Sequence, residues 1–197
     1  AAATQRGIVV MNAPHGNAVT TAEHAIALIL ALARKVPQAN ASTHAGRWEK
    51  ERFVGMELAG KTLGIVGCGN VGSIVADRAH GLKMRVIAYD PYLSDERTRD
   101  LAVEKRELDD VLRHADIITL HAPSTESTRH MIDAAALAKT KPGVLIVNCA
   151  RGDLIVEADL KAAIEKGQVG GAALDVFAEE PARRNPLFGL EQVIATP

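Results

Sequence analysis

The stretch from Leu63 to Ala79, "LGIVGCGNVGSIVADRA", constrains the fold of this 197-residue chain more than any other. Its first half is a short apolar run typical of a buried strand, and its second half has helical spacing. Gly67, Gly69 and Gly72 lie between them. In such a junction the first glycine allows a tight turn, the second lets backbone approach a pyrophosphate, and the third lets helix and strand pack closely. The stretch therefore predicts a dinucleotide-binding turn.

An acidic residue follows at the expected distance. Asp90 ends the predicted strand "RVIAYD", 18 residues after Gly72. A carboxylate there accepts hydrogen bonds from both adenosine ribose hydroxyls and repels the 2′-phosphate of NADP, so the pattern favours NAD. Two alternatives stay open: an Asp that only caps the turn before Pro91, and the S-adenosylmethionine site of methyltransferases, which share a glycine-rich turn and a strand-end acid.

Strands and helices alternate along most of the chain, which predicts an α/β fold with a doubly wound parallel sheet of the Rossmann type. The predicted strands are Gly7–Asn12, Thr62–Val66, Arg85–Tyr89, a short one near Ala102–Glu104, Ile117–Leu120, Val144–Asn148, Gly171–Leu174 and Val193–Ala195. The predicted helices between the later strands are Val71–His80, Leu108–His114, Ala134–Thr140 and Glu157–Lys166.

An earlier helix is predicted to open at a capping box formed by Thr20 and Glu23 and to run to about Lys35. Pro37 must kink or restart it, and a second helical piece is expected to reach about His44 before Gly46 ends it.

Composition excludes several classes of protein. The net charge is −1 with no basic stripe, so no nucleic-acid partner is expected. No apolar run reaches the roughly 18 residues of a membrane span, so no membrane contact is expected. The spacing of the two cysteines matches no disulfide or metal-binding pattern, so we interpret them as reduced thiols of a cytoplasmic protein. The seven histidines have no ligand spacing either, and no metal site is expected.

Polar residues follow two of the predicted strands. Arg151 lies just past Val144–Asn148, and Asp175, Glu179 and Glu180 lie past Gly171–Leu174. An arginine and a carboxylate at this edge of the sheet suit anion binding and acid–base chemistry. The structural alternatives are an Arg151 that pairs with a nearby acid and a solvated turn at Glu180-Pro181.

Five stretches in a fixed order resemble the D-isomer-specific 2-hydroxyacid dehydrogenases. They are "GIVVMNAPHGNAVTTAEHAIALILALAR", "GKTLGIVGCGNVGSIVADRA", "VIAYDPY", "AKTKPGVLIVNCARG" and "GAALDVFAEEP". Together they span nearly the whole chain. The resemblance implies an NAD-binding Rossmann domain of an enzyme that acts on a small 2-hydroxy acid.

Within the family, "MNAPHGN" and "WEKERF" favour the enzymes that oxidise 3-phosphoglycerate to 3-phosphohydroxypyruvate in serine biosynthesis. Reductases of glyoxylate or hydroxypyruvate carry similar signatures and are the first alternative. The second is a non-catalytic NAD-sensing binding module, as in the related transcriptional co-repressors.

The resemblance also assigns residue roles. Asn70 and Val71 would meet the pyrophosphate, and Asp90 the adenosine ribose. The backbone at Cys149 and Ala150, with the Asp175 carboxylate, would position the nicotinamide carboxamide. The implied cofactor-binding set is Gly67, Gly69, Asn70, Val71, Gly72, Asp90, Cys149, Ala150, Arg151 and Asp175.

Two of the assigned residues are implied to serve catalysis. Arg151 would clamp the substrate carboxylate and polarise its 2-oxygen. Glu180 would orient a catalytic histidine and raise its pKa, since a nearby negative charge favours imidazolium.

Two positions depart from the family pattern. Asp153 stands where the family usually has Gly, and Val156 stands where it has an Asp that caps the next helix. Loss of the cap is expected to weaken that helix by about 1 kcal/mol, unless Asp153 or Glu157 compensates. A carboxylate at position 153 is also expected to compete for the guanidinium of Arg151.

The family's catalytic histidine directly follows "VIATP", Val193–Pro197, and its substrate domain precedes the cofactor domain. We therefore expect residues 1–16 to be the remnant of the substrate domain's last strand and hinge, and residues 17–197 to be the dinucleotide-binding domain. Such a chain is expected to bind cofactor without useful turnover. His121 is interpreted as a structural strand-end histidine, with a catalytic base as the alternative.

The helix Thr20–Lys35 is apolar over most of its circumference, and a sheet covers only one side of it. The resemblance implies a homodimer formed through this helix and the segment after it. Trp48 is either an anchor of that interface or a side chain folded onto its own domain. Arg47, Lys50 and Arg52 are interpreted as a solvated face, with contact to a substrate phosphate across the dimer as the alternative.

Overall fold

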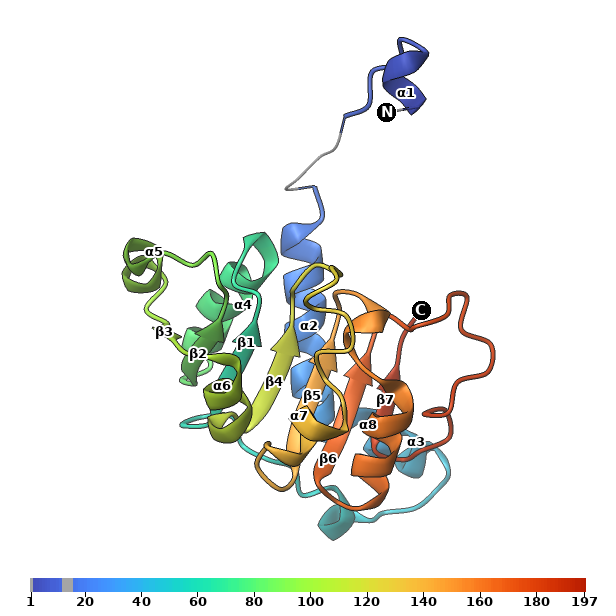
Figure 1. Ribbon diagram of the computed structural model, residues 1–197. Coiled ribbons are helices and arrows are strands. Elements are labelled where there is room, and N and C mark those ends of the chain that lie inside the picture. Colours follow the sequence, from blue (N-terminus) through green and yellow to red (C-terminus); the bar gives the residue numbers. More distant parts are fainter. Residues whose placement is uncertain (1, 12–15) are drawn as a thin grey trace.

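The structure, a computed structural model, describes residues 2–11 and 16–197. One seven-stranded sheet organises it, in the order β3-β2-β1-β4-β5-β6-β7 with every neighbouring pair parallel (Figure 1). The strands are β1 (Thr62–Val66), β2 (Arg85–Tyr89), β3 (Glu104–Lys105), β4 (Ile117–Leu120), β5 (Val144–Asn148), β6 (Val169–Leu174) and β7 (Val193–Ala195). The predicted doubly wound parallel sheet is confirmed. Its order reverses between β1 and β4, the point at which such sheets bind ligands.

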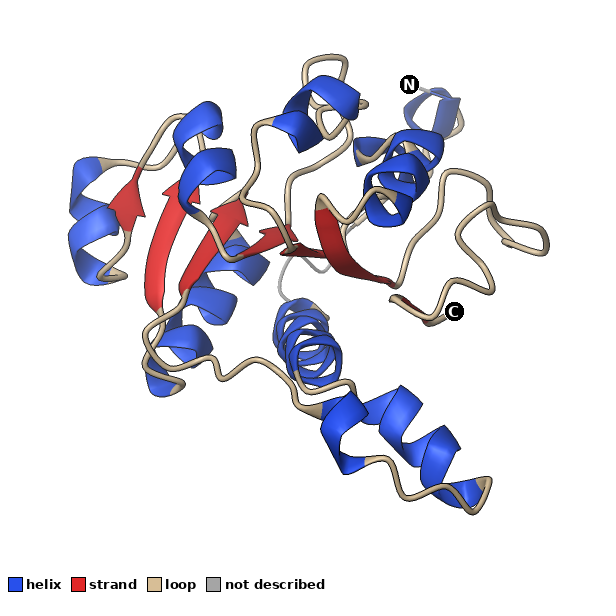
Figure 2. Ribbon diagram, turned by 90° about the horizontal axis from the view of Figure 1, so that it is seen from below, coloured by secondary structure: helices blue, strands red, loops and turns tan. Residues whose placement is uncertain are grey.

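Helices cover both faces of the sheet (Figure 2). α2 (Ala18–Ala33) and α4 (Asn70–Gly81) pack on one face, while α6 (Leu108–His114), α7 (Ala134–Ala138) and α8 (Glu157–Glu165) pack on the other. Successive strand residues point to opposite faces, so Ile117 joins the core under α2 and Ile118 the core under α6. Both faces of the central strands are therefore buried, as their continuous apolar runs require.

The start of α2 differs from the prediction. The helix begins at Ala18, two residues before Thr20, and its N-cap Asn17 makes no side-chain capping bond. Ala18 is itself buried, and the backbone bond from Thr21 to the carbonyl of Asn17 closes the first turn. The predicted capping box at Thr20 is therefore wrong, because core contact extends the helix beyond it.

The break at Pro37 is confirmed. α2 ends at Ala33, Lys35 adopts a left-handed conformation with φ of 53°, and α3 (Val36–His44) restarts with the proline in its first turn. Gly46, with φ of 74°, ends this second helix as expected. A 3₁₀ turn, η1 (Lys50–Phe53), lies in the segment before β1.

The strand predicted at Gly7–Asn12 is wrong over its described part. Residues 7–11 form no strand, and Ile8, Val9, Val10 and Met11 are exposed. A strand needs a neighbour to satisfy its backbone groups, and no strand that the structure describes pairs with these residues. Asn12 lies outside the described residues. A short helix, α1 (Ala2–Gln5), precedes the segment.

The region between β2 and α6 also departs from expectation. The strand predicted near Ala102–Glu104 is shifted to Glu104–Lys105, because Ala102 takes a left-handed φ of 50° that no strand residue adopts. α5 (Asp95–Asp100) was not predicted. Its signal is Ser94, whose hydroxyl accepts the N–H of Arg97, followed by two acidic residues in the first turn.

Candidate functional site

The glycine turn between β1 and α4 is shaped by close contacts that only glycine permits. Gly67 has φ of 90°, and a Cβ there would lie 2.6 Å from the backbone nitrogen of Ala122. A Cβ on Gly72 would collide with the carbonyl oxygen of Gly67. At Gly69 a Cβ would meet nothing within 4 Å. Two glycines therefore serve packing, while the third faces open space at the N-terminus of α4, where a phosphate is favoured.

Asp90 is fixed beside this turn by two backbone donors. Its Oδ2 accepts the N–H of Cys68 at 2.8 Å, and its Oδ1 accepts the N–H of Tyr92 at 2.8 Å. Each carboxylate oxygen has a further lone pair. The carboxylate thus braces the turn and still offers acceptors for ribose hydroxyls. The capping role left open for Asp90 and the ribose role are compatible.

The ends of β5 and β6 carry the second group of predicted residues. Asn148, the last residue of β5, is 1% exposed; its amide donates to the carbonyl of Arg151 and accepts the N–H of Ala150. Gly152 packs so closely on the backbone of Phe177 that any side chain would collide with it. These contacts bring the loop after β5 onto the loop after β6. Asn148 was not predicted as a site residue, although a buried polar residue at a strand end was a visible signal.

Arg151 and Glu180 line one cavity of about 600 Å³ at this junction. Arg151 is exposed, and its Nη1 donates to the carbonyl oxygen of Ala150 at 2.6 Å. Glu180 accepts the N–H of Phe177 at 3.0 Å. The cation and the carboxylate open to the same space without an ion pair between them, which suits an anionic ligand held beside an acid–base group.

The expected competition of Asp153 for Arg151 is wrong. Asp153 instead accepts the hydroxyl of Ser124 at 2.6 Å and lies 3.6 Å from Nε of Arg129. Arg151 lines the cavity, and its guanidinium bonds to the carbonyl of Ala150 and not to Asp153. The backbone joins the two segments: Ile132 and Ile155 form an isolated β-bridge, and the N–H of His130 donates to the carbonyl of Asp153 at 2.8 Å.

The expected loss of a cap on α8 is confirmed. Its N-cap, Val156, makes no side-chain capping bond, and neither acid replaces it. Asp153 bonds elsewhere, and Glu157 accepts the N–H of Ala178 at 2.9 Å. Glu157 and Asp159 still lie in the first turn, where negative charge complements the helix dipole.

Asp175 and Cys149 occupy the neighbouring strand ends. Asp175 Oδ1 accepts the hydroxyl of Thr196 at 2.6 Å and lies 3.0 Å from Nε2 of His24 on α2. Burial, together with the charge of Asp175, raises the pKa of the Cys149 thiol to about 12. Cys149 is thus a neutral thiol at pH 7. His24 and Thr196 were not predicted, because their contacts join segments far apart in the sequence.

His121 follows β4 and lies against the glycine turn, where its backbone N–H donates to the carbonyl of Val66. Its Nε2 is 2.9 Å from the hydroxyl of Thr119, and burial lowers its pKa to about 4. An imidazole that resists protonation at neutral pH, and that does not line the Arg151 cavity, fits the structural interpretation of His121.

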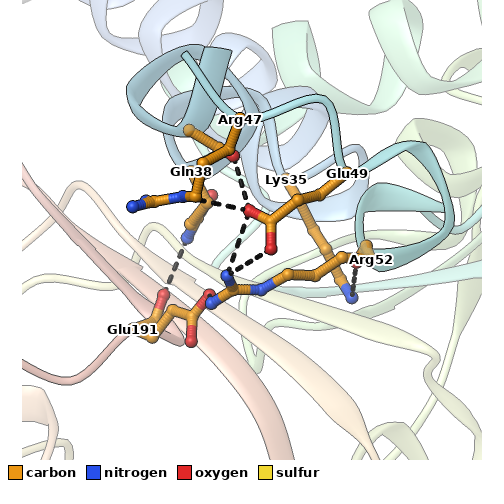
Figure 3. Close-up of polar contacts among 7 residues, drawn as sticks. Lys35, Gln38, Arg47, Glu49, Arg52 and Glu191 are labelled. Atoms are coloured by element: carbon orange, nitrogen blue, oxygen red, sulfur yellow. Dashed lines mark hydrogen bonds and ion pairs between the residues drawn. The ribbon is translucent and has the colours of Figure 1, made fainter. Parts of the chain in front are cut away.

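A second cavity, of about 580 Å³, opens at the amino ends of β5 and β6, opposite the ends that carry Arg151 and Asp175. Beside it Arg47 and Arg52, two of the basic residues after α3, are paired with carboxylates of the chain (Figure 3). Arg52 contacts Glu191 at 2.6 Å and Glu49 at 3.4 Å, and Arg47 contacts Glu49 at 3.3 Å. Arg47, Lys50 and Arg52 are all exposed, which agrees with their interpretation as a solvated face, and two of them are in addition paired within the chain.

Trp48 is 77% exposed, with Nζ of Lys50 lying 5.6 Å from its ring centroid. The alternative in which Trp48 folds onto its own domain is therefore wrong. In the described ranges, no helix is long and apolar enough to cross a membrane, and no three His, Cys, Asp or Glu side chains are gathered as metal ligands. Cys68 and Cys149 are both free and buried.

The residues at the glycine turn and at the carboxyl ends of the strands fit a bound NAD. The open space at Gly69 adjoins the N-terminal turn of α4, and Asp90 offers carboxylate acceptors beside it. Parallel strands end at one edge of the sheet, so the loops that carry Cys149, Arg151 and Asp175 lie along the same edge as the glycine turn.

Comparison with known proteins gives concordant findings. The family model described as D-isomer specific 2-hydroxyacid dehydrogenase, NAD binding domain, matches residues 26–197. The chain is 51% identical over 197 residues to a D-3-phosphoglycerate dehydrogenase of Archaeoglobus fulgidus, covering 100% of this chain and 37% of that protein. It is 49% identical over 195 residues to the enzyme of the same name from Bacillus subtilis, covering 99% of this chain and 37% of that protein.

A solved structure titled as a glyoxylate reductase from Paecilomyes thermophila is 35% identical, with a TM-score of 0.90. The match covers 100% of this chain and 60% of that one. The chain thus spans little more than a third of the length of the curated relatives named above.

Proposed function

This chain belongs to the D-isomer specific 2-hydroxyacid dehydrogenase family, as an NAD-binding domain, and from that premise we propose that its protein oxidises 3-phosphoglycerate to 3-phosphohydroxypyruvate. Over its whole length, the sequence of this chain is about 50% identical to relatives named D-3-phosphoglycerate dehydrogenase. This similarity supports the choice of substrate. The cavity shared by Arg151 and Glu180 supports the choice of reaction.

In this proposal the cofactor is held by three groups of residues. The open backbone at Gly69, with Asn70 and Val71 in the first turn of α4, receives the pyrophosphate. Asp90 receives the adenosine ribose. Ala150 and Asp175, with the backbone at Cys149, orient the nicotinamide carboxamide. When bound, NAD supplies the acceptor for the hydride that leaves C2 of the substrate.

Arg151 and Glu180 act on the substrate side. The guanidinium of Arg151 holds the substrate carboxylate by charge-assisted hydrogen bonds and polarises the 2-oxygen. Glu180 orients the histidine that takes the hydroxyl proton and, by its negative charge, raises the pKa of that histidine. In this proposal the histidine is the one that the family resemblance leads us to expect directly after Pro197. Arg151 thus supplies positive charge to the substrate, and the histidine held by Glu180 supplies the proton acceptor.

The test is a comparison of substrates with the full-length protein that contains this chain. We expect NAD-dependent oxidation of D-3-phosphoglycerate with a kcat/KM at least about tenfold above that for D-glycerate, because binding of the phosphate adds to the specificity. The Arg151→Gln variant should lose at least about 100-fold in kcat/KM. Equal activity on the two substrates would contradict the substrate proposal.

A reductase of glyoxylate or hydroxypyruvate is the second candidate, favoured by the structural match to the glyoxylate reductase. The same assay run in the reductive direction separates the two. If glyoxylate is reduced with a higher kcat/KM than 3-phosphohydroxypyruvate, the second candidate replaces the first.

We also propose that the protein is a homodimer formed through α2 and the segment around Trp48. On α2 the apolar residues Val19 and Leu30 are exposed, on a helix of which seven of the 16 residues are buried, and Trp48 is 77% exposed. Exposed aromatic and aliphatic side chains of this size gather at protein interfaces. A cytoplasmic location is proposed on the two free, buried cysteines.

A further inference from the structure

Two side chains from distant parts of the chain converge on one carboxylate oxygen of Asp175. Nε2 of His24, on α2, lies 3.0 Å from Oδ1 of Asp175, just past β6. The hydroxyl of Thr196, just past β7, lies 2.6 Å from the same oxygen and 3.3 Å from Nε2 of His24. The positions of His24 and Asp175 are 151 residues apart in the sequence.

The donors in this group follow from chemistry. An ionised carboxylate only accepts hydrogen bonds, so the hydroxyl of Thr196 donates to Asp175. Having donated its hydrogen there, that hydroxyl can only accept from His24. Nε2 of His24 therefore carries a hydrogen, which it directs mainly at Asp175.

Both bonds use the same oxygen. Among the residues that the structure describes, Oδ2 of Asp175 has no hydrogen-bond partner. The backbone of Asp175 is held as well, because its N–H donates to the carbonyl of Asn148 at 3.0 Å. One carboxylate oxygen is thus anchored and the other is left to a ligand.

We propose that His24 and Thr196 are positioning residues that fix Asp175 so that Oδ2 accepts an N–H of the nicotinamide carboxamide. This inference rests on the proposed function, which gives Asp175 its contact with the cofactor. A carboxylate held in one orientation loses less freedom when the ligand arrives, so the contact strengthens binding of the nicotinamide half.

The position of the group favours ligand positioning over a structural tie. The side chains of His24 and Asp175 are 39% and 27% exposed, so water competes for their hydrogen bond and its contribution to folding is small. The group also lies past the ends of β6 and β7, at the ligand-binding edge of the parallel sheet.

The test compares two ligands on the chain and its variants by calorimetry. NADH contains the nicotinamide, whereas ADP-ribose contains the adenosine, pyrophosphate and both riboses without it. His24→Leu removes the donor at similar volume and should weaken NADH by about 5- to 10-fold, while ADP-ribose changes less than about twofold. Thr196→Val should shift NADH in the same direction.

His24→Gln is the matched control, because its amide nitrogen can take the place of Nε2 and donate to Asp175. We expect NADH affinity within about twofold of the unmodified chain for this variant. Thermal unfolding monitored by circular dichroism checks that each variant is folded. The analogue 3-acetylpyridine adenine dinucleotide lacks the carboxamide N–H, so His24→Leu should weaken it less than it weakens the natural cofactor.

Three results would overturn the inference. Equal loss of NADH and ADP-ribose in His24→Leu would make His24 a structural residue. No loss in His24→Leu, with a clear loss of NADH in Asp175→Ala, would leave the role of Asp175 intact and remove that of His24. If neither variant alters the ratio of the two affinities, both the inference and the proposed contact of Asp175 fail.

Discussion

Gly69 and Gly72 lie three residues apart in one turn, yet the space around them predicts opposite consequences for an added methyl group. In Gly69→Ala the new Cβ meets nothing within 4 Å, so folding should be preserved while the methyl group occupies the space of the pyrophosphate. We expect an unfolding midpoint within about 3 °C of the unmodified chain and at least a tenfold weaker NADH affinity, about 1.4 kcal/mol.

Gly72→Ala is the comparison. Its Cβ collides with the carbonyl oxygen of Gly67, so this variant should lose roughly 2 kcal/mol or more of folding free energy in urea denaturation. If both variants destabilise the fold equally, or if Gly69→Ala binds NADH normally, the assignment of the open space to the pyrophosphate is refuted.

His121 carries a pH prediction. Burial lowers its pKa in the folded chain to about 4, against an ordinary value of 6.5, so the unfolded chain binds more protons between these two pH values. Its stabilising contribution is therefore present above pH 6.5 and is lost as the pH falls towards 4. This loss amounts to as much as about 3 kcal/mol from this group.

The measurement is urea denaturation of the chain and of His121→Asn at pH 7 and pH 4.5. The variant should show the smaller decrease on acidification, whereas His44→Asn, at an exposed histidine, should behave like the unmodified chain. An NMR titration in which His121 protonates near pH 6.5 would be the contrary result.

Individual site residues could be predicted where the chemistry is local. Gly67, Gly69, Gly72 and Asp90 follow from a single strand–turn–helix–strand unit, and the structure places them together. His24 could not be found in this way, because its partner Asp175 is brought to it only by the packing of α2 against the sheet.

Among the elements, the edge strand β3 has two residues and depends on side chains for its position. Glu104 accepts hydrogen bonds from Arg85 of β2 at 2.8 Å and from Arg106 at 2.9 Å. The hydrogen bond from Arg85 is the larger cause, and the hydrogen bond from Arg106 the next, of the lowering of the pKa of Glu104 to about 2.

Because the folded pKa lies below the ordinary 4.5, the stabilisation by Glu104 is present above pH 4.5 and is lost as the pH falls towards 2. Glu104→Gln should cost about 0.5–1 kcal/mol at pH 7, a value reduced for solvent screening of this exposed group. The difference should shrink below about 0.3 kcal/mol at pH 2.5 in urea denaturation. Glu126→Gln, in an exposed loop, serves as the control; a pH-independent cost of Glu104→Gln would contradict the ion-pair explanation.

The elements that sequence patterns located best are the buried ones. β1, β2, β4 and β5 have the predicted bounds, since continuous apolar runs between polar turns leave little choice. β7 also has its predicted bounds, although it is only partly buried. The errors fall where burial gives no signal. α5 has no buried residue and was missed, and Gly7–Met11 has strand composition without a neighbouring strand.

For the whole molecule, the exposed residues of α2 predict association. Light scattering at micromolar concentration should give a dimer, and Leu30→Glu should shift it to a monomer with unchanged circular dichroism, because a charge is costly in an apolar interface. Ala158→Glu, on α8 at the other face of the sheet, should leave the dimer intact. A monomer for the unmodified chain would refute the interface.

The fold of the whole molecule was more predictable than its quaternary arrangement. Alternation of strands and helices determines a parallel sheet through the handedness of its connections, and the observed strand order follows that rule. The partner of an exposed helix face is not encoded by periodicity, since the same apolar residues can pack within a chain or between chains.

The identification of this chain as an NAD-binding domain is tested most directly by calorimetric titration with NADH and NADPH. Asp90 is held beside the glycine turn by the N–H groups of Cys68 and Tyr92, and in the proposed complex its charge faces the ribose 2′ position. We predict that NADH binds at least about tenfold more tightly than NADPH, and that Asp90→Ala narrows this ratio while the control Asp77→Ala does not. Equal affinity of the unmodified chain for the two cofactors, or a preference for NADPH, would contradict the assignment of Asp90.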